Sequence, residues 1–573
     1  MHRKVGDRND QGGKIVGGGD SRRLDSKSPA INVVRRLKDI GTSRMQRLIH
    51  PIKRLMRRTA AIWLPVMLMG VASGCTTAVV AHDSNQFDAA KAKIVLDAGF
   101  SFIQDVYIDK PDIADLTLTG LNGLRRIEPA LAVIRSPKGE HVSLLVDGKS
   151  EATAKLEATD DAVAWARTAT RLIEAGRNSS RILKNATAEE IYAVIFENMA
   201  HQLDKYTRYS TAEAAREERA QRDGFGGIGA SIEAHADGAL ISAVKSDQPA
   251  NIAGLQVGDR ILAVAGQPIA GLAHRRVIGL LRGPVKTNVQ LTIRRDARDE
   301  PFTVSVTRAY IIEQTVFLRV HEGFALIRLT GFNQDTLREM REATEEALQT
   351  VEPTLRGIII DLRGNPGGLL DQAVEVADLF LKSGAILRTK GRHPRSMQYF
   401  DADNDAVDIE TPIAVLLDGA SASAAEIVAS ALQDQGRAII VGASSFGKGT
   451  VQQVRKLPND GQLVLTWARM HAPSGYVLHR LGVLPTICTS RISDSAAAVK
   501  AFTATDGETI RRDFRARRNA NQATEDKLMT LKKLCPWQPH EGEDLDLEIA
   551  EAVLRQRALY EKLLAFARPP IGS

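Results

Sequence analysis

A serine and a lysine between residues 411 and 453 have side chains that together could perform nucleophilic chemistry. Ser423 follows an apolar run, residues 413–417, and precedes residues 424–433, whose spacing predicts a helix that stops at Gly436. A serine at such a strand-to-helix junction lies at the end of a sheet, where free N–H groups of the helix's first turn can stabilise developing negative charge. Ser423 is therefore the candidate nucleophile.

The candidate base is Lys448, because a serine needs a proton acceptor and this stretch contains no histidine. A lysine can act as a base only when its pKa falls from about 10.4 towards 7, which costs about 4–5 kcal/mol and requires a desolvated pocket. Gln452 follows four positions later and could orient the amine without recharging it. Four residues along a straight strand span about 13 Å, so the backbone after Gly449 must bend if both side chains are to converge.

Three motifs occur in a characteristic order: DLRGNPGG at residues 361–368, SASAAEI at 421–427 and FGKGTVQ at 446–452. Together they resemble the C-terminal processing peptidases, also called tail-specific proteases. The resemblance implies that Ser423, Lys448 and Gln452 form a Ser-Lys-Gln catalytic set, a physically reasonable variant of the serine triad. It also implies an oxyanion hole made by the backbone N–H groups of Gly368 and Ala424.

The sequence departs from the family pattern at Ala420, where the family often has another serine, and a helix-entry position tolerates that change. Asp361 and Arg363 could be mistaken for catalytic charges. We expect them instead to hold their loop through an ion pair or backbone hydrogen bonds.

A glycine-rich bend that leads into a strand, FGGIGASI at residues 225–232, opens a different unit. With AGLQVGDRIL at 253–262 and a closing strand at 289–294, it resembles a PDZ domain. In such a domain the loop's N–H groups receive a peptide's terminal carboxylate while the peptide adds to the sheet edge, a role that falls here to Ile228, Gly229 and Ala230. This loop offers amides and an apolar pocket rather than a cation. A phosphate loop is disfavoured, because a strand follows and the Gly-Lys-Ser/Thr ending is missing.

Length and composition predict several globular domains, since the chain has 573 residues of which 43% are hydrophobic and 25% charged. The net charge of +7 is misleading. Residues 1–58 hold sixteen Lys and Arg against five Asp, a net charge of +11, so the remainder carries −4. We therefore expect no nucleic-acid partner, because the basic excess lies in a leader and not on a folded face.

The N-terminal part has the pattern of a bacterial export signal. Basic residues at 53–58 precede an apolar run, residues 60–71, and then Ala72-Ser73-Gly74-Cys75. That run is too short to favour a spanning helix. Small residues ending at a cysteine resemble a lipoprotein lipobox, in which Cys75 becomes the lipidated first residue of the mature chain. The alternative is ordinary cleavage near Ala72 or Ala78 with release of a soluble protein.

The sequence predicts a multidomain α+β protein. The catalytic core, with its α/β alternation, is expected to be of the ββα type seen in crotonase-like and Clp-like folds, and the PDZ unit to be a small β-sandwich or barrel. The expected segments are a basic disordered leader or mis-assigned start (1–58), a signal peptide with lipobox (59–75), a mostly helical region with an inserted β-element (85–222), the PDZ domain (223–308), the protease core (309–490) and a helical C-terminal extension (491–573).

Two cysteines remain once Cys75 is lipidated, and we expect Cys488 and Cys535 to form a disulfide. An exported protein matures in an oxidising compartment, where thiols rarely stay free. Such a bond would fasten an otherwise dispensable extension to the core. The alternative is two unrelated buried thiols.

The sequence thus predicts a serine endopeptidase that cleaves proteins near their free C-termini, located in the periplasm and lipid-anchored to the outer membrane. No cofactor is expected, and no metal, because His393, His471 and His479 lack a ligand pattern. An adaptor or activator protein stays open as a further partner. One alternative function is a catalytically idle PDZ lipoprotein that acts as an adaptor, which an intact Ser423 and Lys448 disfavour. Another is a crotonase-like acyl transferase, which the PDZ segment disfavours.

Overall fold

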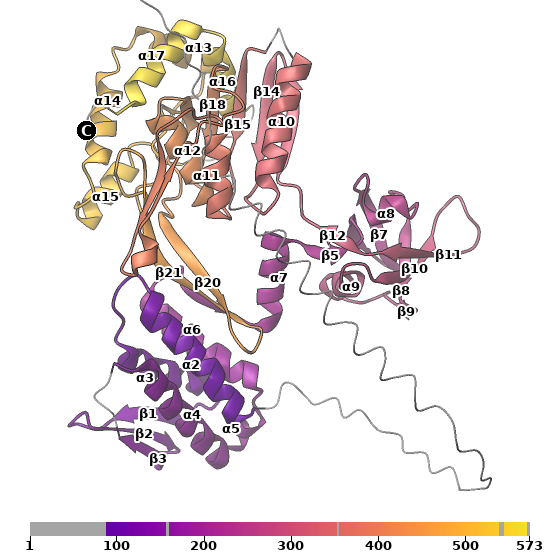
Figure 1. The fold of residues 1–573 in the computed structure, drawn as a ribbon, viewed down its shortest axis with the longest axis vertical. Coiled ribbons are helices and arrows are strands. Elements are labelled where there is room, and N and C mark those ends of the chain that lie inside the picture. Colours follow the sequence, from indigo (N-terminus) through magenta and orange to yellow (C-terminus); the bar gives the residue numbers. More distant parts are fainter. Residues whose placement is uncertain (1–86, 156–159, 352–354, 538–543, 570–573) are drawn as a thin grey trace, which may run out of the picture. The chain divides into compact units, whose positions relative to one another are not determined.

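The structure is a computed structural model that describes residues 87–155, 160–351, 355–537 and 544–569 (Figure 1). The predicted leader, export signal and lipidation site at Cys75 lie outside these residues. None of the helices in the described ranges is long and apolar enough to cross a membrane.

The N-terminal region is a helical layer with a small antiparallel sheet inserted, in the order β1-β2-β3. Its apolar core includes Phe100, Phe196 and Tyr209, and it also takes in Leu463 and Leu465 from the catalytic part of the chain. The elements are α2 (Ala89–Val106), α3 (Ile113–Asn122), β1 (Leu131–Arg135), β2 (His141–Val146), β3 (Lys149–Lys155), α4 (Ala162–Ser179), α5 (Arg181–Asn185), α6 (Ala188–Leu203), β4 (Arg208–Ser210) and α7 (Ala212–Asp223).

The next unit contains an antiparallel sheet in which five strands pair in the order β11-β10-β8-β7-β6, and β9 pairs with β8. The sequence predicted closure at residue 294, but two further strands follow, and β12 pairs with β5 to bring the ends of the unit together. The elements are β5 (Phe225–Gly227), β6 (Ala230–His235), β7 (Gly238–Val244), α8 (Pro249–Ile252), β8 (Arg260–Val264), β9 (Gln267–Pro268), α9 (His274–Leu281), β10 (Asn288–Arg294), β11 (Phe302–Thr307) and β12 (Ala309–Ile311).

The catalytic part is built on a six-stranded sheet in the order β13-β14-β15-β18-β19-β22, parallel except for β13. A buried parallel sheet needs apolar residues on both faces, and β15 and β18 are buried along their whole length. The elements are β13 (Val316–His321), β14 (Phe324–Leu329), α10 (Thr336–Val351), β15 (Gly357–Asp361), α11 (Leu370–Asp378), β18 (Ile413–Leu417), α12 (Ala424–Asp434), β19 (Ala438–Gly442) and β22 (Ile487–Cys488).

The two faces of this sheet are covered by different parts of the sequence. Ile358 and Ile360 of β15 face the core formed with α10, α11 and α12, whereas Ile359 between them faces the C-terminal helices, because side chains alternate along a strand. The C-terminal extension therefore covers one of the two faces of the sheet and is not a dispensable addition. Its helices are α13 (Ser495–Ala504), α14 (Glu508–Arg518), α15 (Glu525–Lys532), α16 (Leu545–Leu554) and α17 (Arg557–Ala567).

A second sheet, in the order β17-β16-β21-β20, completes the catalytic part, and β4 pairs with β21. Its strands are β16 (Ala385–Lys390), β17 (Gln398–Asp401), β20 (Thr450–Lys456) and β21 (Gln462–His471). The structure contains a disulfide between Cys488, at the end of β22, and Cys535, with 5.7 Å between their Cα atoms. The bond links the edge of the parallel sheet to the segment after α15.

Candidate active site

Ser423 is the residue that immediately precedes α12, at the carboxyl end of β18. Its backbone has φ 57° and ψ −112°, a conformation that a residue with a Cβ seldom adopts. Backbone strain of this kind persists only where the surroundings enforce it, and it often occurs at functional sites. The side chain is 8% exposed. The serine is thus held at the N-terminus of a buried helix with a small opening to solvent.

A cavity of about 650 Å³ opens at Ser423, and all five residues predicted for catalysis line it: Ser423, Lys448, Gln452, Gly368 and Ala424. The lining also includes apolar residues, among them Phe332, Leu369 and Ile427. Polar residues from the N-terminal region line it as well, namely Arg208 and, from α7, Glu218 and Arg222. The N-terminal region therefore contributes to the site, which the sequence did not indicate.

Two backbone N–H groups beside Ser423 are free to bind an oxyanion. Within the described residues, neither the Gly368 nor the Ala424 N–H donates a hydrogen bond. A Cβ atom on Gly367 would lie 2.8 Å from the Ser423 Cβ and 2.9 Å from the Ala424 nitrogen, so only glycine allows this close approach. Gly368 also has no room for a side chain, because an added Cβ would lie 2.1 Å from the Phe332 carbonyl oxygen.

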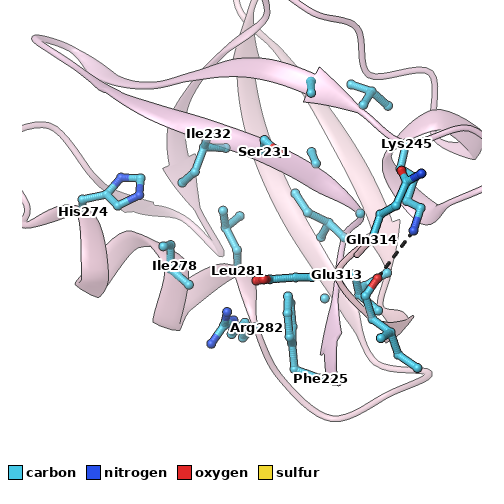
Figure 2. Close-up of a pocket in the computed structure, with 18 of the residues that line it drawn as sticks. Phe225, Ser231, Ile232, Lys245, His274, Ile278, Leu281, Arg282, Glu313 and Gln314 are labelled. Atoms are coloured by element: carbon cyan, nitrogen blue, oxygen red, sulfur yellow. Dashed lines mark hydrogen bonds between the residues drawn. The ribbon is translucent and has the colours of Figure 1, made fainter. Parts of the chain in front are cut away.

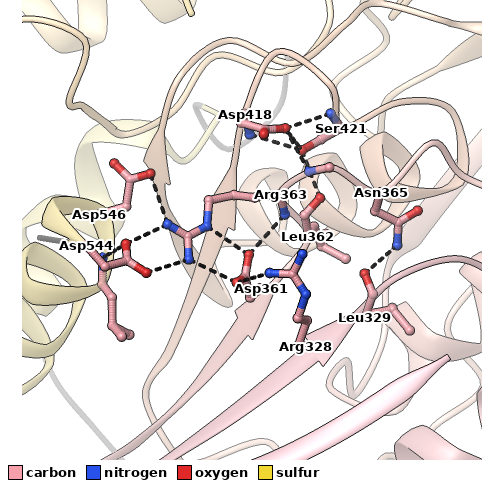
Figure 3. A network of polar contacts seen from close by, with 12 residues as sticks. Arg328, Leu329, Asp361, Leu362, Arg363, Asn365, Asp418, Ser421, Asp544 and Asp546 are labelled. Carbon is pink, nitrogen blue, oxygen red and sulfur yellow. Dashed lines mark hydrogen bonds and ion pairs between the residues drawn. The ribbon is translucent and has the colours of Figure 1, made fainter. Parts of the chain in front are cut away.

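The loop that carries these glycines is fixed by a polar network (Figure 3). Asp361 accepts hydrogen bonds from the Arg363 N–H and from its guanidinium and pairs with Arg328 at 3.1 Å, as expected for a structural role. Arg363 also reaches Asp544 at the start of α16. Asp418, at the end of β18, accepts a hydrogen bond from the Gly364 N–H. These contacts join three distant segments and set the position of Gly367 and Gly368.

Lys448 lies in an irregular loop between β19 and β20 and is partly buried. Burial lowers the pKa of its amine, the nearby Arg208 guanidinium lowers it further, and Glu426 acts in the opposite direction. The Nζ atom lies 5.7 Å from the centre of the Tyr206 ring. Within the described residues, the Lys448 amine is hydrogen-bonded to no other protein group, whereas the Ser423 side chain takes part in a capping box with Glu426 at the start of α12. Catalytic hydrogen bonds are often long before substrate binds and tighten in the complex.

Gln452 reaches the cavity through a bend in β20. The pairing of β20 with β21 shifts register between Val451 and Gln452, and such a bulge bends the strand as the sequence required. The Gln452 amide nitrogen donates to Thr450 Oγ1 at 2.8 Å. Its amide oxygen accepts no hydrogen bond from the described residues and is available to the Lys448 amine. The proposed orienting role of Gln452 stays a prediction.

Glu426 is a central residue of the site to which the sequence gave no role. It lies on the first turn of α12, is completely buried, and accepts hydrogen bonds from the N–H groups of Ser423, Gly447 and Lys448 and from the Ser445 hydroxyl. Burial raises the pKa of Glu426, while these donors oppose the shift by stabilising the carboxylate. One side chain therefore fixes the backbone of both the nucleophile and the base.

A second cavity, of about 630 Å³, lies between β6 and α9 (Figure 2). Ile228, Gly229 and Ala230, the residues predicted to bind a peptide terminus, line it with Ile278 and Leu281 of α9. The N–H groups of Ile228 and Gly229 donate no hydrogen bond within the described part of the chain. Two cations from outside the glycine loop, Lys245 and Arg282, also line the cavity, and the prediction made for the loop alone did not include them.

One group of carboxylates in the described residues, Asp378, Asp403 and Asp405, is close enough to hold a metal ion. None of the three lines the cavity at Ser423. Burial and the neighbouring Asp403 raise the pKa of Asp378 to about 6. The expectation that the candidate site uses no metal stays a prediction.

Comparisons with known proteins match two segments of the chain. Two family models match the chain, peptidase family S41 over residues 323–489 and the PDZ domain over residues 217–294. A carboxy-terminal-processing protease of Bartonella bacilliformis is 41% identical over 290 residues, which are 50% of this chain and 66% of that protein. A probable CtpA-like serine protease of Staphylococcus aureus is 31% identical over 314 residues, 54% of this chain and 62% of that protein.

Among solved structures, a photosystem II D1 C-terminal processing protease aligns with a TM-score of 0.36 and 22% identity, over 69% of this chain and 92% of that one. The sequence matches cover slightly less than two thirds of the two curated relatives. Ser423, Ala424, Lys448, Gln452 and Gly368, which line the cavity, all lie within the segment that the peptidase model matches. The chain therefore contains a segment similar to peptidase family S41 and a segment similar to a PDZ domain.

Proposed function

We propose that this chain is an endopeptidase that captures the free C-terminus of a protein in its PDZ groove and cleaves a peptide bond near that end. The observation that carries the proposal is the cavity that gathers Ser423, Lys448 and two unengaged N–H groups. A nucleophile, a base and an oxyanion site in one cavity are the parts that acyl transfer requires.

The reaction follows from the position of these groups. Neutral Lys448 takes the proton of the Ser423 hydroxyl as Oγ attacks the substrate carbonyl carbon. The negative charge that develops on the carbonyl oxygen is bound by the N–H groups of Gly368 and Ala424. The Lys448 ammonium then gives its proton to the leaving amine, and an ester on Ser423 remains. Lys448 then takes a proton from water, whose oxygen attacks the ester carbonyl. The ester bond breaks, the Lys448 ammonium returns the proton to Ser423 Oγ, and the second product leaves.

The surroundings of Lys448 support its role as a base. A lysine must lose its proton to accept another, and burial together with Arg208 lowers its pKa. Glu426 opposes this shift, yet its carboxylate is already bound to four donors that do not include the Lys448 amine. The surroundings of Lys448 therefore favour the neutral form of its amine more strongly than bulk water does.

The rate of peptide cleavage should rise with pH as Lys448 loses its proton. Because the pKa of this amine is lowered, we expect the rise to lie at lower pH than for an ordinary lysine. The measurement is kcat/KM for an unstructured substrate from about pH 6 to 9. A flat profile would count against a lysine base.

Cleavage should depend on a free C-terminal carboxylate. The groove offers the Ile228 and Gly229 N–H groups and the cations Lys245 and Arg282, all of which favour an anion, together with the apolar Ile278 and Leu281. We expect kcat/KM for a polypeptide with an apolar last residue to fall about tenfold or more when its terminus is amidated, since a hydrogen bond to a charged group contributes about 1.5–3 kcal/mol.

The comparison uses two substrates that are identical except for the terminal acid or amide. Equal cleavage of the two would show that the PDZ unit does not capture C-termini. No cleavage of either would contradict the peptidase proposal itself.

We further propose that the chain is exported and anchored to the outer membrane through lipids on Cys75. The basic residues, the apolar run and the small residues before Cys75 support this, and they lie outside the described residues. A Cys75→Ala chain should leave the membrane fraction of the cell, and its retention there would contradict the anchor. An adaptor or activator protein stays an open partner.

A further inference from the structure

The loop that carries Lys448, residues 443–449, has no regular secondary structure, so its shape depends on what holds it. Glu426 holds it from α12. The Ser421 carbonyl accepts a hydrogen bond from the Phe446 N–H at 2.9 Å. A third set of contacts comes from the C-terminal extension, which lies far along the chain from both Ser423 and Lys448.

Lys532, the last residue of α15, makes the most direct of these contacts. Its Nζ donates to the Phe446 carbonyl at 2.5 Å and lies 5.5 Å from the centre of the Phe446 ring. The N–H of the same peptide group belongs to Gly447 and donates to Glu426 Oε1 at 2.7 Å. The two polar ends of one peptide unit are therefore bound by opposite charges, a lysine on the carbonyl and a glutamate on the N–H.

This peptide unit needs such support because of its sequence position. Gly447 has φ 85°, a conformation that glycine reaches easily and leaves easily. Rotation of the Phe446–Gly447 peptide would break both hydrogen bonds and redirect the chain at Lys448, the next residue. A charge-assisted hydrogen bond at each end of the peptide makes that rotation costly.

Neighbouring contacts hold α15 against the loop. Arg517 of α14 is 2% exposed and donates both to the Leu531 carbonyl of α15 and to the Ser444 hydroxyl of the loop, each at 3.5 Å. Beyond α15, the Cys535 carbonyl accepts a hydrogen bond from the Ser444 N–H at 3.1 Å, and the Cys488–Cys535 disulfide links that segment to the parallel sheet. Lys532 thus projects from a helix that other contacts also join to the loop.

We propose that Lys532 is a positioning residue for Lys448, and that the C-terminal extension thereby forms part of the catalytic machinery. The proposal rests on the proposed function, in which Lys448 is the base. Lys532 does not line the cavity at Ser423, so it acts through the Phe446 carbonyl and not on the substrate. The apolar packing of α13, α16 and α17 on the sheet involves other residues and would survive its replacement.

The test compares three variants of the full chain. Lys532→Met removes the donor and keeps most of the side-chain stem. We expect kcat to fall about tenfold or more, because small displacements of a catalytic group are costly, while KM and Tm change little. The rise of kcat/KM with pH should also move to higher pH, since a loosened loop lets water reach the Lys448 amine and reverses the effect of burial.

Two variants serve as controls. Lys532→Arg retains a donor and should restore most of the lost kcat. Lys533→Met alters the adjacent, exposed lysine, whose side chain makes no polar contact with the described residues, and it should behave as the unmodified chain.

The outcomes separate this inference from the proposed function. An unchanged kcat and pH profile in Lys532→Met, with Ser423→Ala inactive, would overturn the positioning role alone. A fall in kcat that Lys532→Arg does not reverse would also overturn it. Cleavage that persists in Ser423→Ala would instead overturn the proposed function.

Discussion

Ser423→Ala and Lys448→Ala chains should each cleave an unstructured protein substrate at least about a thousandfold more slowly than the unmodified chain. Removing either member of one proton-transfer unit loses most of what the unit provides, because the remaining member has no partner in the reaction. The Lys448 amine is hydrogen-bonded to no protein group within the described residues, so its loss leaves no buried group unpaired there. Loss of the Ser423 hydroxyl removes a capping contact with the Glu426 N–H, but that N–H also donates to the Ser423 carbonyl and keeps this acceptor. The folded state should therefore keep its Tm, which thermal unfolding measures alongside kcat.

Ser430→Ala is a matched control for the nucleophile. Ser430 is also a buried serine of α12, and its hydroxyl donates only to the Ile427 carbonyl at 3.2 Å. Its replacement should leave turnover within about twofold, as expected for loss of one weak hydrogen bond within a helix. Near-normal turnover by both Ser423→Ala and Lys448→Ala would refute the assignment and favour an adaptor that does no chemistry.

Replacement of Glu426 by Ala should both destabilise the fold and abolish activity. Four donors lose their acceptor in a site that water does not reach: the N–H groups of Ser423, Gly447 and Lys448 and the Ser445 hydroxyl. Unpaired buried donors cost about 1–3 kcal/mol each before relaxation, so we expect the free energy of unfolding to fall by about 3 kcal/mol or more. Urea unfolding of the purified chain measures this difference.

Activity should fall in Glu426→Ala even under conditions where the chain remains folded, because the backbone of both Ser423 and Lys448 loses its common anchor. Glu345→Ala on α10 provides a control, since Glu345 is exposed and makes no side-chain contact with the described residues. A Glu426→Ala chain as stable and as active as this control would show that the carboxylate has neither role.

The sequence located the parts of the site that depend on local signals. Apolar runs bounded by Pro412, Asp418 and Gly436 predicted β18 and the extent of α12 almost to the residue, because strand and helix limits follow from short-range periodicity and turn residues. The same local reasoning placed Ser423 at a strand-to-helix junction and implied the need for a bend before Gln452. Family motifs supplied Gly368 and Ala424, whose free N–H groups the structure brings beside the serine.

Periodicity was less reliable where two faces of a helix are both partly apolar. The helical spacing of residues 87–106 predicts a packing face that includes Ile94, Val95 and Phe102. In α2 the Ile94 side chain is 56% exposed, while Val95 and Phe102 are buried. Apolar residues at helical spacing indicate which side of a helix is buried, but they locate the edge of that side only to within one residue position.

Only the tertiary structure decided which distant segments support the reaction. Tyr206 and Arg208 from the N-terminal region reach Lys448, Lys245 and Arg282 add charge to the peptide groove, and the C-terminal extension covers one face of the sheet. Lys532 binds the Phe446 carbonyl from 86 positions away. Contacts of this kind leave no periodic signal, because they depend on where the chain returns in space and not on the residues beside it. The sequence by itself therefore located the candidate reacting groups, and only the tertiary structure showed which distant segments hold them in place.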